Sequence, residues 1–188
     1  MSERHRFRAE WHDYNGGIYF ITICTALRQP LLGRISCSSF YPTELGKIVD
    51  EHINSLPSHY HNVEVWNYVV MPNHIHLVIS VGTRLIASAE ATVTNATKVA
   101  ATSMGCLKGP RHAEPVSDFH HNSSLATIIG AFKAGVTRTA RTRLIASLPV
   151  WQSRYYEHII RNQWSFDNIM NYIDNNVADW AGDCFYEK

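Results

Sequence analysis

The order of strand-like and helix-like segments limits the fold of this chain more than any other feature. Strands are indicated by β-branched and aromatic residues or by strict alternation, and helices by apolar residues three and four positions apart. These patterns predict strands over 18–25, 31–36, 63–70, 74–80 and 150–160, and helices over 42–57, from 124 onward and over 166–178. This mixture predicts an α+β fold, and the natural candidate is the ferredoxin-like βαββαβ plan, an antiparallel sheet with helices packed on one face.

Individual residues predict where the helices begin and end. Pro42 suits the first position of a helix because its φ angle is already helical, and Pro57 predicts the end of the same helix. Ser165 is expected to cap the last helix. Residues 81–122 are dominated by Ala, Thr, Ser and Gly, so we expect a flexible insertion there, with some helix near 87–101.

Length and composition indicate one ordinary globular domain over residues 1–188, of which 45% are apolar. No apolar run approaches the length of a membrane span, and no apolar stretch follows the N-terminal Arg4, Arg6 and Arg8 as in a secretory signal. A cytoplasmic protein without a membrane partner is therefore expected. The net charge is only +1, but residues 124–163 hold six basic residues and Glu157 as their one acidic residue, which could supply a phosphate-binding face.

His74 and His76 form the first chemical constellation. Alternation along a strand points both imidazoles to one face, with Cβ atoms roughly 6–7 Å apart, while Ile75 and Leu77 point to the other. Two imidazoles at that separation can share one metal ion. Two solvent-facing histidines on a half-exposed strand remain the alternative.

Tyr172 and Asn176 form the second constellation, on the predicted last helix. Residues four positions apart lie on one helical face, and this face is not the one that Ile169 and Ile173 share. A phenol and an amide oxygen could therefore reach the same ion. Taken singly, a helical tyrosine is more often a core residue, and an asparagine is common at a helix end.

Residues 71–79, MPNHIHLVI, resemble the metal motif of single-tyrosine transposases of the His-hydrophobic-His (HUH) class. Further segments resemble, in order, blocks of the branch known as REP-associated tyrosine transposases. These segments are YFITICT at 19–25, IIGAFK at 128–133, VWQ at 150–152, YEHIIR at 156–161 and NYIDNN at 171–176. The resemblance spans nearly the whole chain apart from 81–122.

The resemblance implies an enzyme that cleaves and rejoins single-stranded DNA on a ferredoxin-like domain. It implies that His74, His76 and Asn176 bind Mg²⁺ or Mn²⁺. It also implies that Tyr172, on a C-terminal helix, is the nucleophile that forms a 5′-phosphotyrosine link and frees a 3′-hydroxyl. The expected partner is single-stranded or hairpin DNA, and the expected assembly is a monomer or homodimer.

Basic and aromatic residues supply candidates for DNA contacts. Phosphate contacts are predicted for Lys133, Arg138, Arg141, Arg154 and Arg161, with Arg4, Arg6 and Arg8 as a flexible arm. Stacking on unpaired bases is predicted for Trp151, Tyr155 and Trp164.

Two other functions stay open at this point. One is a zinc-dependent hydrolase that uses His74 and His76 with His158 or Glu157 as a third ligand. The other is a nucleic-acid-binding module without catalysis, which would expose aromatic side chains on central strands. Tyr155 and Tyr156 are competing nucleophiles, but neither has a ligand-type residue four positions later on a helix, so Tyr172 is preferred.

Overall fold

The computed structural model describes residues 16–82, 123–145, 149–182 and 184–186, which all belong to one compact unit. The insertion predicted at 81–122 lies outside the described residues except for its first two positions, and the helix predicted near 87–101 lies wholly outside them. The N-terminal arm of Arg4, Arg6 and Arg8 also lies outside them.

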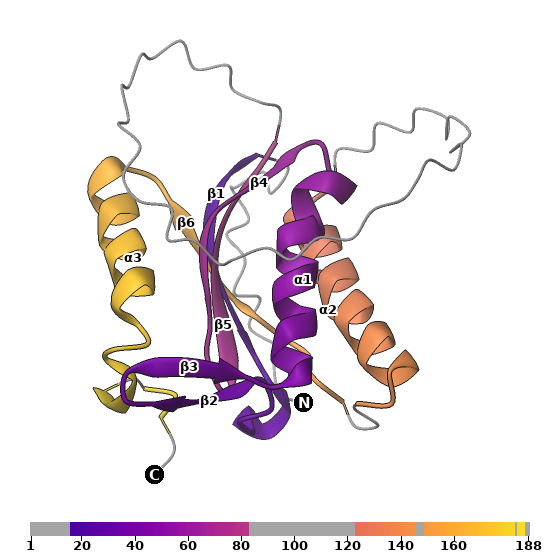
Figure 1. Cartoon of the computed structure of the whole chain (residues 1–188). Coiled ribbons are helices and arrows are strands. Elements are labelled where there is room, and N and C mark those ends of the chain that lie inside the picture. Colours follow the sequence, from indigo (N-terminus) through magenta and orange to yellow (C-terminus); the bar gives the residue numbers. More distant parts are fainter. Residues whose placement is uncertain (1–15, 83–122, 146–148, 183, 187–188) are drawn as a thin grey trace, which may run out of the picture. The chain divides into compact units, whose positions relative to one another are not determined.

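A four-stranded antiparallel sheet forms the centre of this unit, in the order β4-β5-β1-β6 (Figure 1). Its strands are β1 (Gly17–Cys24), β4 (Val63–Val70), β5 (His74–Val81) and β6 (Tyr156–Ile160). With helices α1 (Glu44–His59) and α2 (Leu125–Thr142), the chain order is β1-α1-β4-β5-α2-β6. This connectivity is the predicted βαββαβ order, and the fold is α+β.

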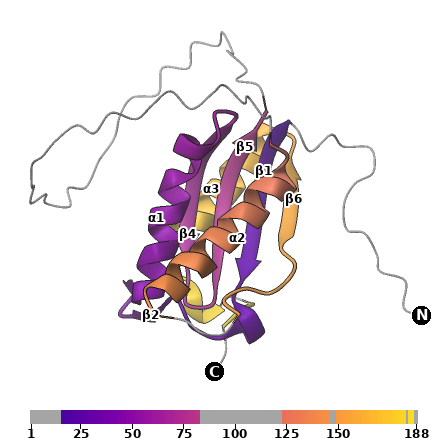
Figure 2. The same cartoon turned by 90° about the vertical axis from the view of Figure 1, so that its right-hand side faces the viewer.

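The main core lies between the sheet and helices α1 and α2, which cover the same face (Figure 2). Buried residues of β5 on this face include Ile75 and Leu77, which belong to the same cluster as Ile48 of α1 and Ile128 of α2. Because side chains alternate along a strand, this packing leaves the even-numbered residues of β5 for the opposite face. The strand that carries the histidine pair is therefore held by a core on its other side.

Helix α3 (Gln163–Asn175) covers the opposite face of the sheet (Figure 1). A smaller apolar cluster joins it to the sheet through Val78, Ile160 and Ile173, with Phe166 and Ile169 packed against them. The predicted apolar side of the last helix is confirmed.

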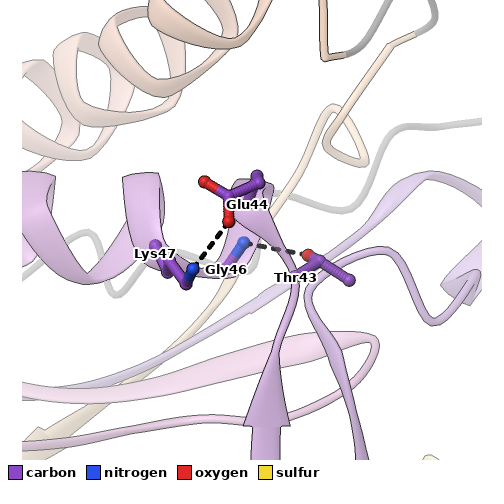
Figure 3. Close-up of polar contacts among 4 residues, drawn as sticks. All are labelled: Thr43, Glu44, Gly46 and Lys47. Carbon is purple, nitrogen blue, oxygen red and sulfur yellow. Dashed lines mark hydrogen bonds and ion pairs between the residues drawn. The ribbon is translucent and has the colours of Figure 1, made fainter.

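The start of α1 differs from the prediction. Pro42 ends strand β3 (Ser39–Pro42), which pairs with β2 (Gly33–Ser36), and the helix begins at Glu44. Thr43 is the N-cap because its hydroxyl accepts a hydrogen bond from the Gly46 N–H at 3.1 Å, and Glu44 pairs with Lys47 at 2.6 Å (Figure 3). The side chain of Pro42 has no oxygen atom that could accept this hydrogen bond, so it cannot cap the helix.

Three other boundaries also differ. Pro57 lies inside α1, which continues to His59. Asn162 caps α3 in place of Ser165, since its side chain accepts from the Ser165 N–H at 2.8 Å. Of the strand predicted over 150–160, only 156–160 is regular, and Trp151 makes an isolated bridge to Thr25. Among the residues that the structure describes, none of the helices has the length and apolar character needed to cross a membrane.

Candidate active site

Strand β5 brings the imidazoles of His74 and His76 together on the face that α3 covers. Their Nε2 atoms are 3.0 Å apart, and the two side chains are 0% and 2% exposed. The alternative of two solvent-facing histidines is therefore wrong, because the surrounding aromatic side chains and α3 exclude solvent from both rings.

Asn73 fixes the orientation of His74. The Asn73 Nδ2 group donates to the carbonyl of Phe185 at 2.8 Å, so its Oδ1 is the acceptor for Nδ1 of His74 at 2.9 Å. With its proton on Nδ1, His74 presents the lone pair of Nε2 toward His76. A histidine ligand held from behind by a polar partner is typical of metal sites.

His76 is held in the same way, from the neighbouring strand. Its Nδ1 is hydrogen-bonded to the hydroxyl of Thr22 on β1 at 2.9 Å, and its ring stacks on Phe20 with the centroids 5.1 Å apart. Both Nε2 atoms therefore face a common point, while both Nδ1 atoms are occupied by buried polar partners.

The electrostatic environment keeps His74 neutral. Burial lowers the pKa of His74 to about 3, and the positive charge of Arg28 acts in the same direction. A neutral imidazole is the form that binds a metal ion.

Helix α3 places the phenol of Tyr172 at this point. The Tyr172 hydroxyl lies 3.1 Å from Nε2 of His76, and the side chain is 43% exposed. The helix is fixed to the sheet by its apolar side and by a hydrogen bond of 2.8 Å from Asn67 of β4 to Asp174. A phenol hydroxyl and two imidazole nitrogens from distant parts of the chain thus converge.

Asn176 follows α3 as its C-cap, one turn beyond Tyr172, with its side chain 2% exposed. Burial of a carboxamide there shows that the residue faces the protein and not the solvent, as the metal-ligand prediction requires. Its role as a ligand stays a prediction.

The spacing of the two nitrogens fits one shared cation. In an octahedron with bonds of about 2.1 Å, adjacent donor atoms lie about 3.0 Å apart, which matches the His74–His76 separation. Two imidazole donors suit Mn²⁺ better than Mg²⁺.

Neither Glu157 nor His158, the two candidates for a third ligand in a zinc-dependent hydrolase, lies at this site. Glu157 pairs with Ile21 across β1 and β6, so it shares the face of the main core and lies on the wrong side of the sheet. His158 is on the correct face but stands exposed on β6, across β1 from the strand of the pair. Within the described ranges no three His, Cys, Asp or Glu side chains gather into a metal site.

The chain was compared with protein-family models and with the sequences of known proteins. No family model matches it. Over 187 residues it is 31% identical to a protein of Haemophilus influenzae described as uncharacterized, and the match covers 99% of this chain and 94% of that protein. The chain belongs to the family of this Haemophilus protein.

The fold of the present chain is similar to that of a solved structure, a REP-associated tyrosine transposase bound to a REP hairpin. The TM-score is 0.53 at 19% sequence identity, over 96% of this chain and 74% of the other. The four-stranded antiparallel sheet with three helices is thus a transposase-like fold, and the structural similarity expected from the sequence is confirmed.

The sequence analysis did not single out several residues that surround the histidine pair, among them Phe185, Trp180 and Arg28. The ring centroids of Phe185 and Trp180 lie 4.5 Å and 6.0 Å from that of His74, and the Arg28 guanidinium lies 5.0 Å from the centroid of Phe185. No local pattern marks these residues, because only the folded chain brings them to β5. Asn73 could have been found from its position beside the motif.

The predicted phosphate contacts on α2 lie beside a cavity of about 570 Å³. Lys133, Arg138 and Arg141 line it together with Gln152 and Ser153. The Lys133 ammonium donates to the carbonyls of Gln152 and Ser153 at 2.6 and 3.1 Å, and burial lowers its pKa. Lys133 therefore joins the 149–153 segment to α2, and the two arginines are the side chains better placed for phosphate.

The other predicted DNA contacts fall into two groups. Arg154, Arg161 and Trp164 are exposed, the last by 77%. Trp151 is only 8% exposed, so the prediction that it stacks on a base is wrong for the folded chain. Tyr155 is half-buried against the main core, and its base stacking stays a prediction. Both aromatic rings pack in or against the main core.

Proposed function

We propose that this protein is a metal-dependent enzyme that cleaves and rejoins single-stranded DNA through a phosphotyrosine intermediate. One observation carries the proposal: the Tyr172 hydroxyl lies 3.1 Å from Nε2 of His76, whose Nε2 in turn lies 3.0 Å from that of His74. The similarity in fold to a transposase bound to a REP hairpin supports hairpin-bearing DNA as the substrate class.

His74, His76 and Asn176 would hold the divalent cation, Mn²⁺ or Mg²⁺. When bound, such an ion polarises the phosphodiester and offsets the charge that develops on its oxygens. The chain itself supplies the rest: Asn73 and Thr22 hold the two rings, and the aromatic neighbours keep water away from them.

Tyr172 would supply the covalent step. Its oxygen forms a bond to phosphorus while the bond from phosphorus to the 3′-oxygen breaks, so the DNA keeps a 5′-phosphate on the enzyme and a free 3′-hydroxyl. The phenol gives up its proton as the bond to phosphorus forms. The leaving 3′-oxygen takes up a proton in exchange. The phosphotyrosine conserves the bond energy, so the reverse attack rejoins DNA without ATP.

Basic residues around the unit would hold the DNA backbone. Arg138 and Arg141 line the cavity on α2, while Arg154 and Arg161 flank β6. Arg28 adds a positive charge beside His74 itself. A monomer or homodimer, as expected from the sequence, remains part of the proposal.

The test is incubation of the purified protein with Mn²⁺ and labelled single-stranded DNA that carries hairpins. We expect a protein–DNA adduct that survives denaturant, is abolished by Tyr172→Phe and by His76→Ala, and is largely kept by Tyr156→Phe, the matched control on β6. An adduct that persists in Tyr172→Phe would refute the nucleophile. DNA binding without any adduct would favour the alternative of a non-catalytic binding module.

A further inference from the structure

Helix α3 covers only part of the sheet face that bears the histidine pair. It contacts β4 through the ring pair Trp66–Phe166, with centroids 5.5 Å apart, and through the hydrogen bond from Asn67 to Asp174. β4 is at one edge of the sheet and β6 is at the other (Figure 2). On the β1 and β6 side, α3 packs with Ile18 and Ile160 in one apolar cluster, whereas Tyr156 and His158 of β6 are exposed. The surface of this face around the first part of β6 is therefore left to exposed side chains.

Strand register identifies these side chains. His76 is opposite Thr22, and Thr22 is opposite Tyr156, so the three residues form one row across β5, β1 and β6. In the next row Phe20 is opposite His158. Neighbouring strands are about 4.8 Å apart, which places the backbone of Tyr156 about 10 Å from that of His76 on the same face.

Tyr156, on the edge strand β6, is 60% exposed, and His158 is exposed on the same strand. The Tyr156 ring, with the His158 imidazole beside it, is therefore open to a stacking partner from solution. Half-buried Phe20 stacks on His76 and makes an edge contact of 6.2 Å with Tyr172. The exposed aromatic surface is thus continuous with the candidate active site.

The charges next to this surface match single-stranded DNA. Arg154 precedes β6 and Arg161 follows it, and both are exposed. Flat rings between cationic side chains form the usual platform for unpaired nucleotides, because every base has a face to stack and every linkage carries a negative charge. Tyr156 and His158 are two residues apart, so their side chains are roughly 6–7 Å apart, room for one base on each.

We propose that Tyr156 is the platform on which the unpaired base next to the scissile phosphate stacks, with His158 under the base that follows. The inference rests on the proposed function, since it places the substrate strand across β1 and β6 with its phosphate at Tyr172. Tyr156 is then a positioning residue for the substrate and not a second nucleophile.

The test uses the Tyr172→Phe protein with Mn²⁺, so that DNA is bound and not consumed. Binding of a labelled hairpin with an unpaired flank is measured by fluorescence anisotropy. Adding Tyr156→Ala is expected to weaken binding about tenfold, whereas Tyr156→Phe, which keeps the ring, stays within about twofold. Tyr156→Leu, which keeps apolar bulk without a flat ring, should resemble the alanine variant. Tyr41→Ala removes a tyrosine that is 49% exposed on β3 and serves as the matched control.

Abasic sites placed one at a time along the unpaired flank locate the stacked base. At one position next to the cleavage site, the abasic DNA should bind the Tyr156→Ala protein and its parent equally well. The inference is overturned if the alanine variant binds every DNA within twofold of its parent, if its deficit is the same at all abasic positions, or if the leucine variant binds like phenylalanine. A different outcome separates the two proposals. If the abasic-site pattern is found but the protein with its natural Tyr172 forms no adduct with DNA, the stacking platform is supported and only the proposed chemistry is refuted.

Discussion

Replacing Thr22 by valine isolates the contribution of the hydrogen bond that holds His76. The two side chains have nearly the same shape, so Thr22→Val removes the hydroxyl 2.9 Å from Nδ1 of His76 and little else. Thr22 is 5% exposed, so the imidazole nitrogen loses its partner in a site that water does not easily reach. The expected cost in the free energy of unfolding is about 1–3 kcal/mol, which lowers Tm by about 2–12 °C in a chain of this size.

The effect on metal binding is the sharper part of this prediction. A ligand that loses its supporting hydrogen bond typically binds metal about 10- to 100-fold more weakly. We expect Thr22→Val to raise the Kd for Mn²⁺ by that factor in calorimetry, and to lose most of the Tm increase that Mn²⁺ produces in the parent. Thr22→Ser, which keeps the hydroxyl, should behave more like the parent.

A matched control exists in the same chain. Thr139 of α2 is hydrogen-bonded to Nε2 of His52 of α1, also at 2.9 Å. Thr139→Val should lower Tm by a similar or smaller amount and leave the affinity for Mn²⁺ unchanged, because that pair joins two helices away from the candidate site. Equal Mn²⁺ affinities of the Thr22 and Thr139 variants would refute the reasoning that Thr22 orients a metal ligand.

Two further predictions concern stability. Asn162→Ala removes the cap of α3 and should cost about 1 kcal/mol in chemical denaturation, whereas Ser165→Ala should change little; the opposite order would contradict the capping geometry. Burial and the hydrogen bond to Asp50 raise the pKa of Tyr68 to about 12 from 10, so the folded state holds its proton more tightly, and the stability from this group is complete below pH 10 and lost as pH rises toward 12. Tyr68→Phe should lose less stability over that range, and equal losses would contradict the assignment.

Most of the fold could be predicted because its signals are local. The strand β1 was predicted from its β-branched and aromatic residues, and β4 and β5 from the two-residue repeat of a strand. This repeat correctly placed His74 and His76 on the face opposite Ile75 and Leu77. Helical spacing likewise identified α1, α2 and α3. The boundaries were less accurate because a cap depends on which side chain reaches a free N–H, as Thr43 and Asn162 do.

The sequence alone predicted the separate groups of residues at the candidate site but not how they meet in space. The HIH motif and the pair of Tyr172 and Asn176 could be seen as two separate constellations, and their resemblance to a transposase family suggested that they act together. Nothing in the spacing of residues indicated that Trp151 would be buried and Tyr155 half-buried against the main core while Tyr156 remains exposed, since that depends on how the segment packs in the folded chain.

The sequence by itself determined that two imidazoles share one face of a strand and that a tyrosine lies on an amphipathic helix, because both are consequences of backbone periodicity. Only the tertiary structure decided that the Tyr172 hydroxyl lies 3.1 Å from His76, across 96 positions of the chain. It also decided that both imidazoles are buried, with Phe185 near both rings and Trp180 near that of His74. The physical reason is that these contacts arise from the packing of α3 and the C-terminal segment on the sheet, and packing is set by the whole core and not by any local repeat.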